Sequence, residues 1–200
     1  MPPVALALVH HPVRDRSGAI ITTAVTNLDV HDIARTARTY DLAAYYLVTP
    51  IEAQRVLVER ILAHWRDGAG ARRVPERSVA LSICVVVPTL EAAVEHMAAR
   101  AGRSPRTFVT GARAPAGKRV LDGAEARSRM SEAPSLILFG TGHGLTPETV
   151  EAADHVLAPI RSGASYNHLS VRAAVAITLD RLFGESGSQL ESQAGSQGGD

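Results

Sequence analysis

The segment Leu136-Ile-Leu-Phe-Gly-Thr-Gly-His-Gly-Leu-Thr-Pro147 combines three kinds of local structure. Its first four residues are apolar and predict a buried strand, the glycines predict a loop, and Thr146-Pro147 is typical of a helix start. Glycine lets the backbone approach a ligand closely, and ligands of open α/β sheets bind at the carboxyl ends of strands. The segment therefore predicts either a ligand-binding loop or a tight turn without a ligand, because spacing alone does not distinguish them.

The glycine spacing argues against two familiar phosphate-binding motifs. Gly140-x-Gly-x-Gly144 differs from the G-x-G-x-x-G dinucleotide fingerprint, and no Gly-Lys-Ser/Thr follows it. The first apolar run is followed by His10-His11-Pro12 rather than by a glycine loop. A dehydrogenase with a dinucleotide-binding fold is therefore a weak hypothesis.

Apolar runs alternate with amphipathic segments along the whole chain. Strands are expected at residues 4–9, 19–25, 44–48, 78–87, 106–110, 136–139 and 155–158. Helices are expected between them, and capping signals at their starts are Asp29, Thr49, Thr89, Thr146 and Ser170. This alternation predicts an α/β protein with a mostly parallel sheet covered by helices on both faces.

Composition is typical of a globular protein with one core. The chain has 200 residues, of which 46% are hydrophobic. Its net charge is +1, so the overall charge gives no indication of nucleic-acid binding. We expect one domain over residues 1–184 and a disordered tail over 185–200, which is rich in Ser, Gly and Gln. No signal peptide or membrane-spanning run is evident, so we expect a soluble cytoplasmic protein. The single cysteine, Cys84, lies in an apolar run and is expected to be buried.

The polar candidates do not form a metal or hydrolase motif. Eight histidines are scattered without H-x-x-x-H spacing or a Cys/His cluster, so no metal site is predicted. No G-x-S-x-G turn is present, and capping is the default role of Ser170.

Two basic regions each allow two interpretations. His31, Arg35 and Arg38 lie on a common side of the helix expected over 27–40, which is either a solvated face or a functional one. Residues 113–129 carry five basic side chains against two acidic ones, and they form either a phosphate-contacting loop or a surface segment with an irregular helix.

Three segments together resemble the SPOUT, or α/β-knot, class of RNA methyltransferases. They are Ile33-Ala-Arg-Thr-Ala37, Leu138-Phe-Gly-Thr-Gly-His-Gly-Leu145, and Leu157-Ala-Pro-Ile160 with Tyr166-Asn-His-Leu-Ser-Val171. The openings Leu-Val-His-His-Pro at 8–12 and Thr-Asn-Leu-Asp-x-His-Asp at 26–32 are similar to those of a stand-alone branch related to tRNA (guanosine-N1)-methyltransferases. The order and spacing of these motifs, rather than any one of them, make the resemblance specific.

The resemblance implies a deep trefoil knot in the C-terminal part, a homodimer with its interface beside the cofactor, and S-adenosylmethionine as methyl donor. It implies that the cofactor is held by Leu138, Phe139, Gly140, Gly142, Gly144, Ile160, Tyr166, Asn167, Leu169 and Ser170. Arg35 matches the first motif and is the catalytic candidate, while His31 and Asp32 are candidates from helix spacing for RNA contact or base chemistry.

Two hypotheses about function follow from the sequence. The first is an S-adenosylmethionine-dependent methyltransferase acting on tRNA or rRNA. The second is an S-adenosylmethionine-binding regulatory or partner-dependent module without independent catalysis, because the charge is near neutral and no added RNA-binding domain is present. Substitution of Arg35 distinguishes them, since only the first predicts loss of methyl transfer.

Overall fold

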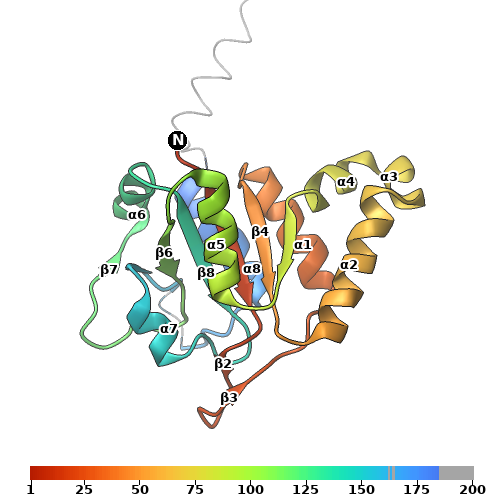
Figure 1. Cartoon of the computed structure of the whole chain (residues 1–200). Coiled ribbons are helices and arrows are strands. Elements are labelled where there is room, and N and C mark those ends of the chain that lie inside the picture. The colour runs from red at the N-terminus through yellow and green to blue at the C-terminus, as the bar shows by residue number, and fades with distance from the viewer. Residues whose placement is uncertain (162, 164, 185–200) are drawn as a thin grey trace, which may run out of the picture.

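The computed structural model describes residues 1–161, 163 and 165–184 (Figure 1). Within this part of the chain, seven strands form one parallel sheet in the order β5-β4-β1-β8-β6-β9-β7. Their bounds are β1 Val4–Val9, β4 Ala44–Val48, β5 Cys84–Val87, β6 Arg106–Val109, β7 Val120–Leu121, β8 Ser135–Gly140 and β9 His155–Leu157. A short antiparallel hairpin, β2 Val13–Arg14 and β3 Ile20–Ile21, follows β1. The predicted tail at 185–200 lies outside the described residues.

Alternating side chains of the central strands build two cores. In β1, Leu6 and Leu8 point into one core, while Ala5 and Ala7 point into the other. All six residues of β1 are buried because the strand pairs with β4 on one edge and β8 on the other. A strand buried on both faces requires a continuous apolar run, and this requirement explains the composition of residues 4–9.

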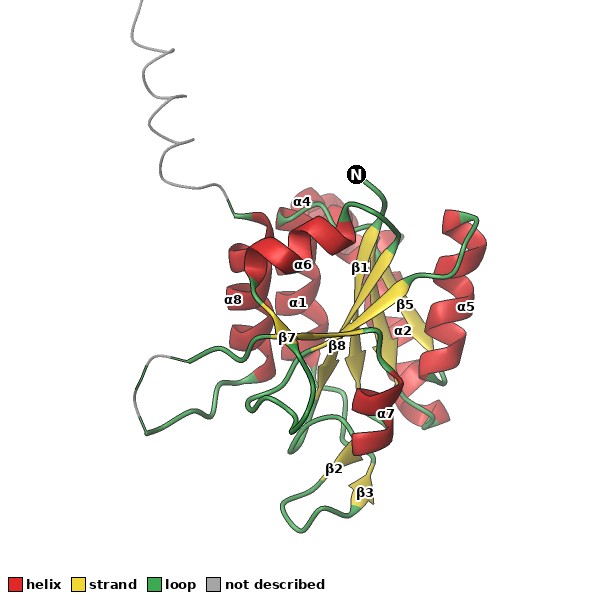
Figure 2. Cartoon of the chain, turned by 90° about the vertical axis from the view of Figure 1, so that its left-hand side faces the viewer, coloured by secondary structure: helices red, strands yellow, loops and turns green. Residues whose placement is uncertain are grey.

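Helices cover both faces of the sheet. Their bounds are α1 Asn27–Thr39, α2 Glu52–Arg66, α3 Ala69–Arg73, α4 Pro75–Leu81, α5 Leu90–Ala101, α6 Gly123–Met130, α7 Pro147–Ala152 and α8 Val171–Phe183. Figure 2 shows α1, α6 and α8 on one side of the sheet and α5 and α7 on the other. The prediction of an α/β fold with a mostly parallel sheet covered on both faces is confirmed.

The expected strand at residues 78–87 was wrong in part. Residues 69–73 and 75–81 are helical, and the strand is confined to Cys84–Val87. Pro75 stands at the start of α4, and Ala80 and Leu81 are buried in a helix that packs against α1 and α2. The β-branched composition is therefore overridden by helix packing.

Two predicted helix caps were also wrong. Thr26, not Asp29, caps α1: its side chain accepts a hydrogen bond from the Asp29 N–H at 3.1 Å. The α2 helix begins at Glu52 with Ile51 at the cap position and no side-chain cap. Thr89, Thr146 and Ser170 cap α5, α7 and α8 as predicted.

The order of the strands locates the candidate site. The chain runs outward from β1 through β4 to β5, then crosses to β6 on the other side of β1 and β8. Crevices open at the carboxyl ends of strands where the direction of winding reverses. This point lies at the ends of β1, β8 and β6, where the glycine loop begins.

Candidate functional site

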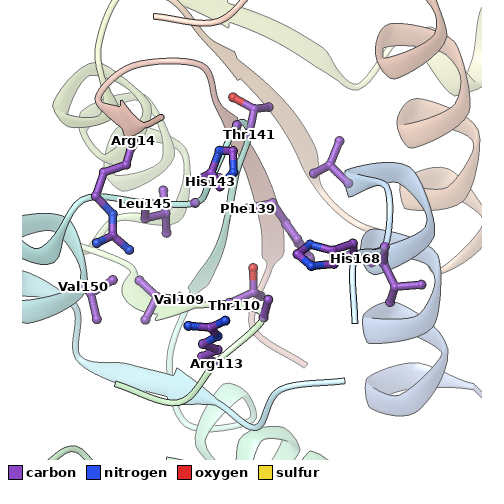
Figure 3. A pocket seen from close by; sticks show the side chains of 18 of the residues that line it. Arg14, Val109, Thr110, Arg113, Phe139, Thr141, His143, Leu145, Val150 and His168 are labelled. Carbon is purple, nitrogen blue, oxygen red and sulfur yellow. The ribbon is translucent and has the colours of Figure 1, made fainter. Parts of the chain in front are cut away.

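A cavity of about 1250 Å³ opens at the carboxyl ends of β6, β8 and β9 (Figure 3). Its walls come from residues within 14–18, 109–115, 139–145, 156–160 and 167–172, together with a few side chains of α1, α7 and α8. A cavity of this size, with walls from several loops, is typical of a small-molecule site.

Close backbone packing requires glycine at two positions, one at the end of β8 and one in the loop after it. A Cβ on Gly140 would lie 2.6 Å from the Leu145 nitrogen, and one on Gly142 would lie 2.8 Å from the Arg14 carbonyl oxygen. Gly142 also has φ +59° and Gly144 has φ +100°, which are backbone conformations that residues with a Cβ rarely adopt. The predicted tight loop is therefore present, and it lines the cavity.

Backbone hydrogen bonds attach the glycine loop to the β2–β3 hairpin. The Arg14 N–H donates to the Gly144 carbonyl at 3.0 Å, and the His143 N–H donates to the Arg14 carbonyl at 2.8 Å. These bonds fix the backbone of Arg14 at the cavity, and Figure 3 shows its guanidinium directed into the cavity.

A partly buried hydrogen-bond chain links β1 to the same loop. The Thr141 hydroxyl donates to the Val9 carbonyl at 3.0 Å, so the Thr23 hydroxyl donates to Thr141 at 2.5 Å and accepts from His10 Nδ1 at 2.9 Å. This assignment leaves His10 Nε2 unprotonated, and that buried atom has no partner among the described residues. Burial lowers the pKa of His10 to about 4, with a smaller opposing effect from Asp29, so the ring is neutral at pH 7.

Most of the predicted cofactor residues line this cavity. They are Phe139, Gly140, Gly142, Gly144, Ile160, Asn167, Leu169 and Ser170. Leu138 faces the opposite core and is buried there. Tyr166 is 75% exposed beside His168, at a ring-centroid distance of 5.3 Å. The structure thus brings residues of the second and third sequence motifs to one cavity, although two predicted contacts do not line it.

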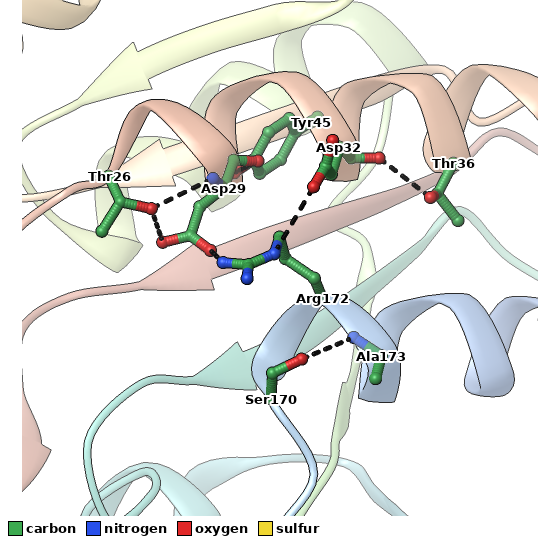
Figure 4. A network of polar contacts seen from close by, with 8 residues as sticks. All are labelled: Thr26, Asp29, Asp32, Thr36, Tyr45, Ser170, Arg172 and Ala173. Atoms are coloured by element: carbon green, nitrogen blue, oxygen red, sulfur yellow. Dashed lines mark hydrogen bonds and ion pairs between the residues drawn. The ribbon is translucent and has the colours of Figure 1, made fainter.

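An ion-pair network joins α1 to α8 at the cavity wall (Figure 4). Arg172 Nη1 donates to Asp29 Oδ1 at 3.0 Å, and its Nε lies 3.5 Å from Asp32 Oδ2. Asp29 Oδ2 also accepts from the Thr26 hydroxyl at 2.6 Å. Asp29 and Arg172 line the cavity, and their mutual pairing fixes the start of α8 against the start of α1.

The three catalytic candidates on α1 do not line the cavity of their own chain. The His31 ring packs edge-on against Trp65 at 5.5 Å, and burial, followed by the charge of Arg77, lowers its pKa. Asp32 faces Arg172, and Arg35 is exposed. Sequence spacing therefore grouped residues that the structure directs to different neighbours.

Most of the basic segment at 113–129 has structural partners. Lys118 donates to the Val150 and Glu151 carbonyls, Arg119 pairs with Glu125, and Arg127 donates to the Arg181 carbonyl. Within this segment, α6 and β7 are ordered elements rather than a loop. Arg113 differs, because it lines the cavity.

Sequence analysis missed Arg14 and Arg172 as cavity residues. Arg14 belongs to no sequence motif, and only the tertiary contact with the glycine loop brings it to the site. Arg172 follows the predicted cap Ser170, and this position at a helix start is a weak signal that it lies near the ligand loop.

Three further observations concern the described residues. No group of three or more His, Cys, Asp or Glu side chains there is arranged to hold a metal ion. Cys84 is buried, as predicted, and burial raises its pKa to about 12, so it is not a thiolate at pH 7. Among the same residues, no helix is long and apolar enough to cross a membrane.

Residues 3–184 match the family described as SAM-dependent RNA methyltransferase. The chain belongs to this family. The predicted resemblance to RNA methyltransferases that use S-adenosylmethionine is thereby confirmed.

Relatives within this methyltransferase family differ in length. A protein from Nitratidesulfovibrio vulgaris named tRNA (guanine-N(1)-)-methyltransferase is 46% identical over 182 residues, which cover 90% of this chain and 41% of that protein. An uncharacterized protein from Aquifex aeolicus is 39% identical over 180 residues and is covered to 88%. The chain therefore spans about two fifths of the first relative and nearly all of the second.

A solved structure shares the fold of this methyltransferase family member. The putative methylase family protein from Neisseria gonorrhoeae superimposes with a TM-score of 0.60 at 12% identity, covering 98% of this chain and 95% of that one. At this identity the similarity concerns the fold.

The cavity residues fit S-adenosylmethionine, the methyl donor of the family. Phe139, Leu157 and Ile160 offer apolar surface for an adenine ring, and Gly140 and Gly142 leave backbone where a Cβ would clash. Arg14 Nε is buried without a hydrogen-bond partner among the described residues, so a polar group of a ligand has a donor available.

Proposed function

We propose that this chain binds S-adenosylmethionine in the cavity and transfers its methyl group to an RNA nucleotide, with tRNA as the first candidate and rRNA as the second. The observation that carries the proposal is the convergence of the glycine loop, residues 156–160 and residues 167–172 on one cavity. The name of the Nitratidesulfovibrio vulgaris relative supports tRNA as the first substrate to test.

When bound, S-adenosylmethionine supplies an electrophilic methyl group on a sulfonium. The protein's own contribution is then to bind, orient and exclude water. Phe139, Ile160 and Leu169 provide the apolar contacts, while Asn167 is positioned by donating from Nδ2 to the Ala112 carbonyl at 3.1 Å. No metal is included in this proposal.

We propose that Arg35 acts on the acceptor nucleotide in the cavity of a partner subunit, because it does not line its own. A homodimer with its interface beside the cavity would bring an exposed α1 side chain to the other subunit. Large apolar side chains exposed near the cavity support such an interface: Leu28 is 57% exposed, and Tyr166 and Leu169 are also exposed. His31 and Asp32 remain candidates for RNA contact at the same interface.

We also propose that the segment between β9 and α8 forms the deep trefoil knot, with one unit spanning 1–184. The strand β9 lies between β6 and β7, yet α8 returns to pack against α1. Asn167 contacts the loop after β6 on the way. An experimental structure that traces residues 158–171 would test this path. A cytoplasmic location is expected, since that is where the proposed substrates are found.

Calorimetric titration with S-adenosylmethionine and S-adenosylhomocysteine tests cofactor binding first. One site per chain in the micromolar range is expected, followed by labelled-methyl transfer to unfractionated tRNA or rRNA. Absence of cofactor binding would refute the proposal. Binding without transfer to any RNA would instead support the regulatory module.

Substitution Arg35→Ala tests the catalytic assignment. Methyl transfer should be abolished while cofactor affinity changes only a few-fold, because the side chain lies outside its own cavity. Arg38→Ala is the matched control, since Arg38 is also exposed on α1 and pairs with Asp41. Mixing Arg35→Ala with Asn167→Ala subunits should restore activity if Arg35 serves the partner's cavity, and no restoration would contradict that arrangement.

A further inference from the structure

Two arginines in the cavity differ in their charge partners. Arg172 is paired with Asp29 and Asp32. The Arg14 side chain has no ion pair or hydrogen bond among the described residues, and its Nε is fully buried. A buried guanidinium N–H without a partner costs free energy, so its retention requires an explanation.

The surroundings of Arg14 direct it toward a ligand. Its backbone is fixed by the glycine loop, and Figure 3 shows its guanidinium directed into the cavity that Val109, Val150 and Arg113 also line. Its neighbour in sequence, Asp15, is occupied by its own turn: Oδ1 accepts from Ser17 N–H, Ser17 O–H and Ala19 N–H. The two carboxylates that line the cavity in the described part of the chain, Asp15 and Asp29, therefore have partners other than Arg14.

We propose that Arg14, assisted by Arg113, forms an anion-binding subsite at this end of the cavity. A planar guanidinium binds two oxygens of a carboxylate or phosphate side by side, and apolar neighbours strengthen that interaction by excluding water. The ligand is an anionic oxygen group, either the carboxylate of the methyl donor or a phosphate of the RNA substrate. This inference rests on the proposed function.

Binding of three probes to wild type and to Arg14→Gln distinguishes a donor carboxylate from an RNA phosphate as the group that Arg14 holds. The probes are S-adenosylhomocysteine, 5′-methylthioadenosine, which lacks the amino-acid portion, and unfractionated tRNA. If Arg14 holds the donor carboxylate, Arg14→Gln should lower the affinity for S-adenosylhomocysteine roughly ten- to hundredfold. The affinity for 5′-methylthioadenosine should stay within about twofold of the wild-type value. If it holds an RNA phosphate, both small ligands should bind as before, while tRNA binds more weakly with a salt slope reduced by about 1.

Three controls complete the test. Arg14→Lys keeps the charge but not the two-pronged donor, so it should show an intermediate loss. Arg72→Gln removes an exposed arginine of α3, away from the cavity, and should leave all three affinities unchanged. Thermal unfolding should give Arg14→Gln a Tm equal to or above that of wild type, because no folded-state partner is lost.

The outcomes distinguish this inference from the proposed function. Unchanged binding of all three probes by Arg14→Gln would overturn the anion subsite while leaving the methyltransferase proposal intact. A large fall in Tm would also overturn it, by assigning Arg14 a structural role. If wild type itself fails to bind S-adenosylhomocysteine, the proposed function fails, and the tRNA measurement alone decides the subsite.

Discussion

The two walls of the cavity are held together by different forces. The glycine wall, residues 139–145, is fixed by backbone hydrogen bonds to β2 and by contacts too close for any Cβ. The helix wall, formed by the starts of α1 and α8, is fixed by side-chain charges between Asp29, Asp32 and Arg172. Backbone contacts tolerate almost no change of sequence, whereas ion pairs weaken gradually with exposure and salt. One wall is therefore intolerant of substitution and the other is adjustable.

Gly140→Ala should have the largest effect, because it acts on the intolerant wall. The new Cβ would meet backbone atoms at 2.6 and 2.9 Å, so the loop must shift, at a cost of about 3 kcal/mol or more. Cofactor binding should be lost with it. Urea unfolding and calorimetry measure the two effects.

Gly144→Ala is the matched control for the glycine wall. Nothing lies within 4 Å of its added Cβ, so only the strain of φ +100° remains, about 1–2 kcal/mol. Equal losses for the two variants would show that conformation, rather than close packing, fixes this wall.

Arg172→Met acts on the helix wall and should lower the free energy of unfolding by about 2–3 kcal/mol. It leaves the Asp29 carboxylate, whose side chain is 7% exposed, without its cation. The loss is placed at the lower end for buried pairs because the Arg172 side chain is 33% exposed. Asp32→Asn, at a 47% exposed side chain, should cost below about 0.5 kcal/mol. A larger loss from Asp32→Asn in urea unfolding would contradict the division of roles.

Acid should destabilise the link between β1 and the glycine wall. The folded-state pKa of His10 is lowered to about 4, below the ordinary 6.5, so the unfolded chain binds a proton first as pH falls. The contribution of neutral His10 to the free energy of unfolding is full above pH 6.5 and is lost progressively down to pH 4. The loss amounts to roughly 2 kcal/mol at pH 5. Unfolding free energies of wild type and His10→Asn between pH 8 and pH 5 measure this. An identical pH slope in both proteins would exclude His10 as the cause.

The sequence predicted the layers of the fold because continuous apolar runs and capping residues are local signals. Residues 4–9 and 135–139 are buried, and strands covered on both faces have such continuous apolar runs. Residues 78–81 were misassigned because helix packing against α1, rather than β-branched composition, decides their conformation.

The site was predictable where it depends on glycine and on motif order, and less so where it depends on tertiary contacts. The glycine loop follows from spacing, but the role of Arg14 depends on hydrogen bonds to Gly144 and His143, far away in sequence. Asp29 carries a cap-like signature, yet its carboxylate pairs across to α8. Charge pairing between distant segments leaves no periodic pattern in a sequence.

The walls of the cavity come from segments near both ends of the described chain, at residues 14–18 and 167–172. A ligand that touches both would act as a removable cross-link between the hairpin and the start of α8. Its binding free energy would add to the resistance of both segments to local opening, in proportion to ligand saturation. Amide protons of β2 and of the first turn of α8 should therefore slow in exchange together, although more than 150 residues separate them in the chain.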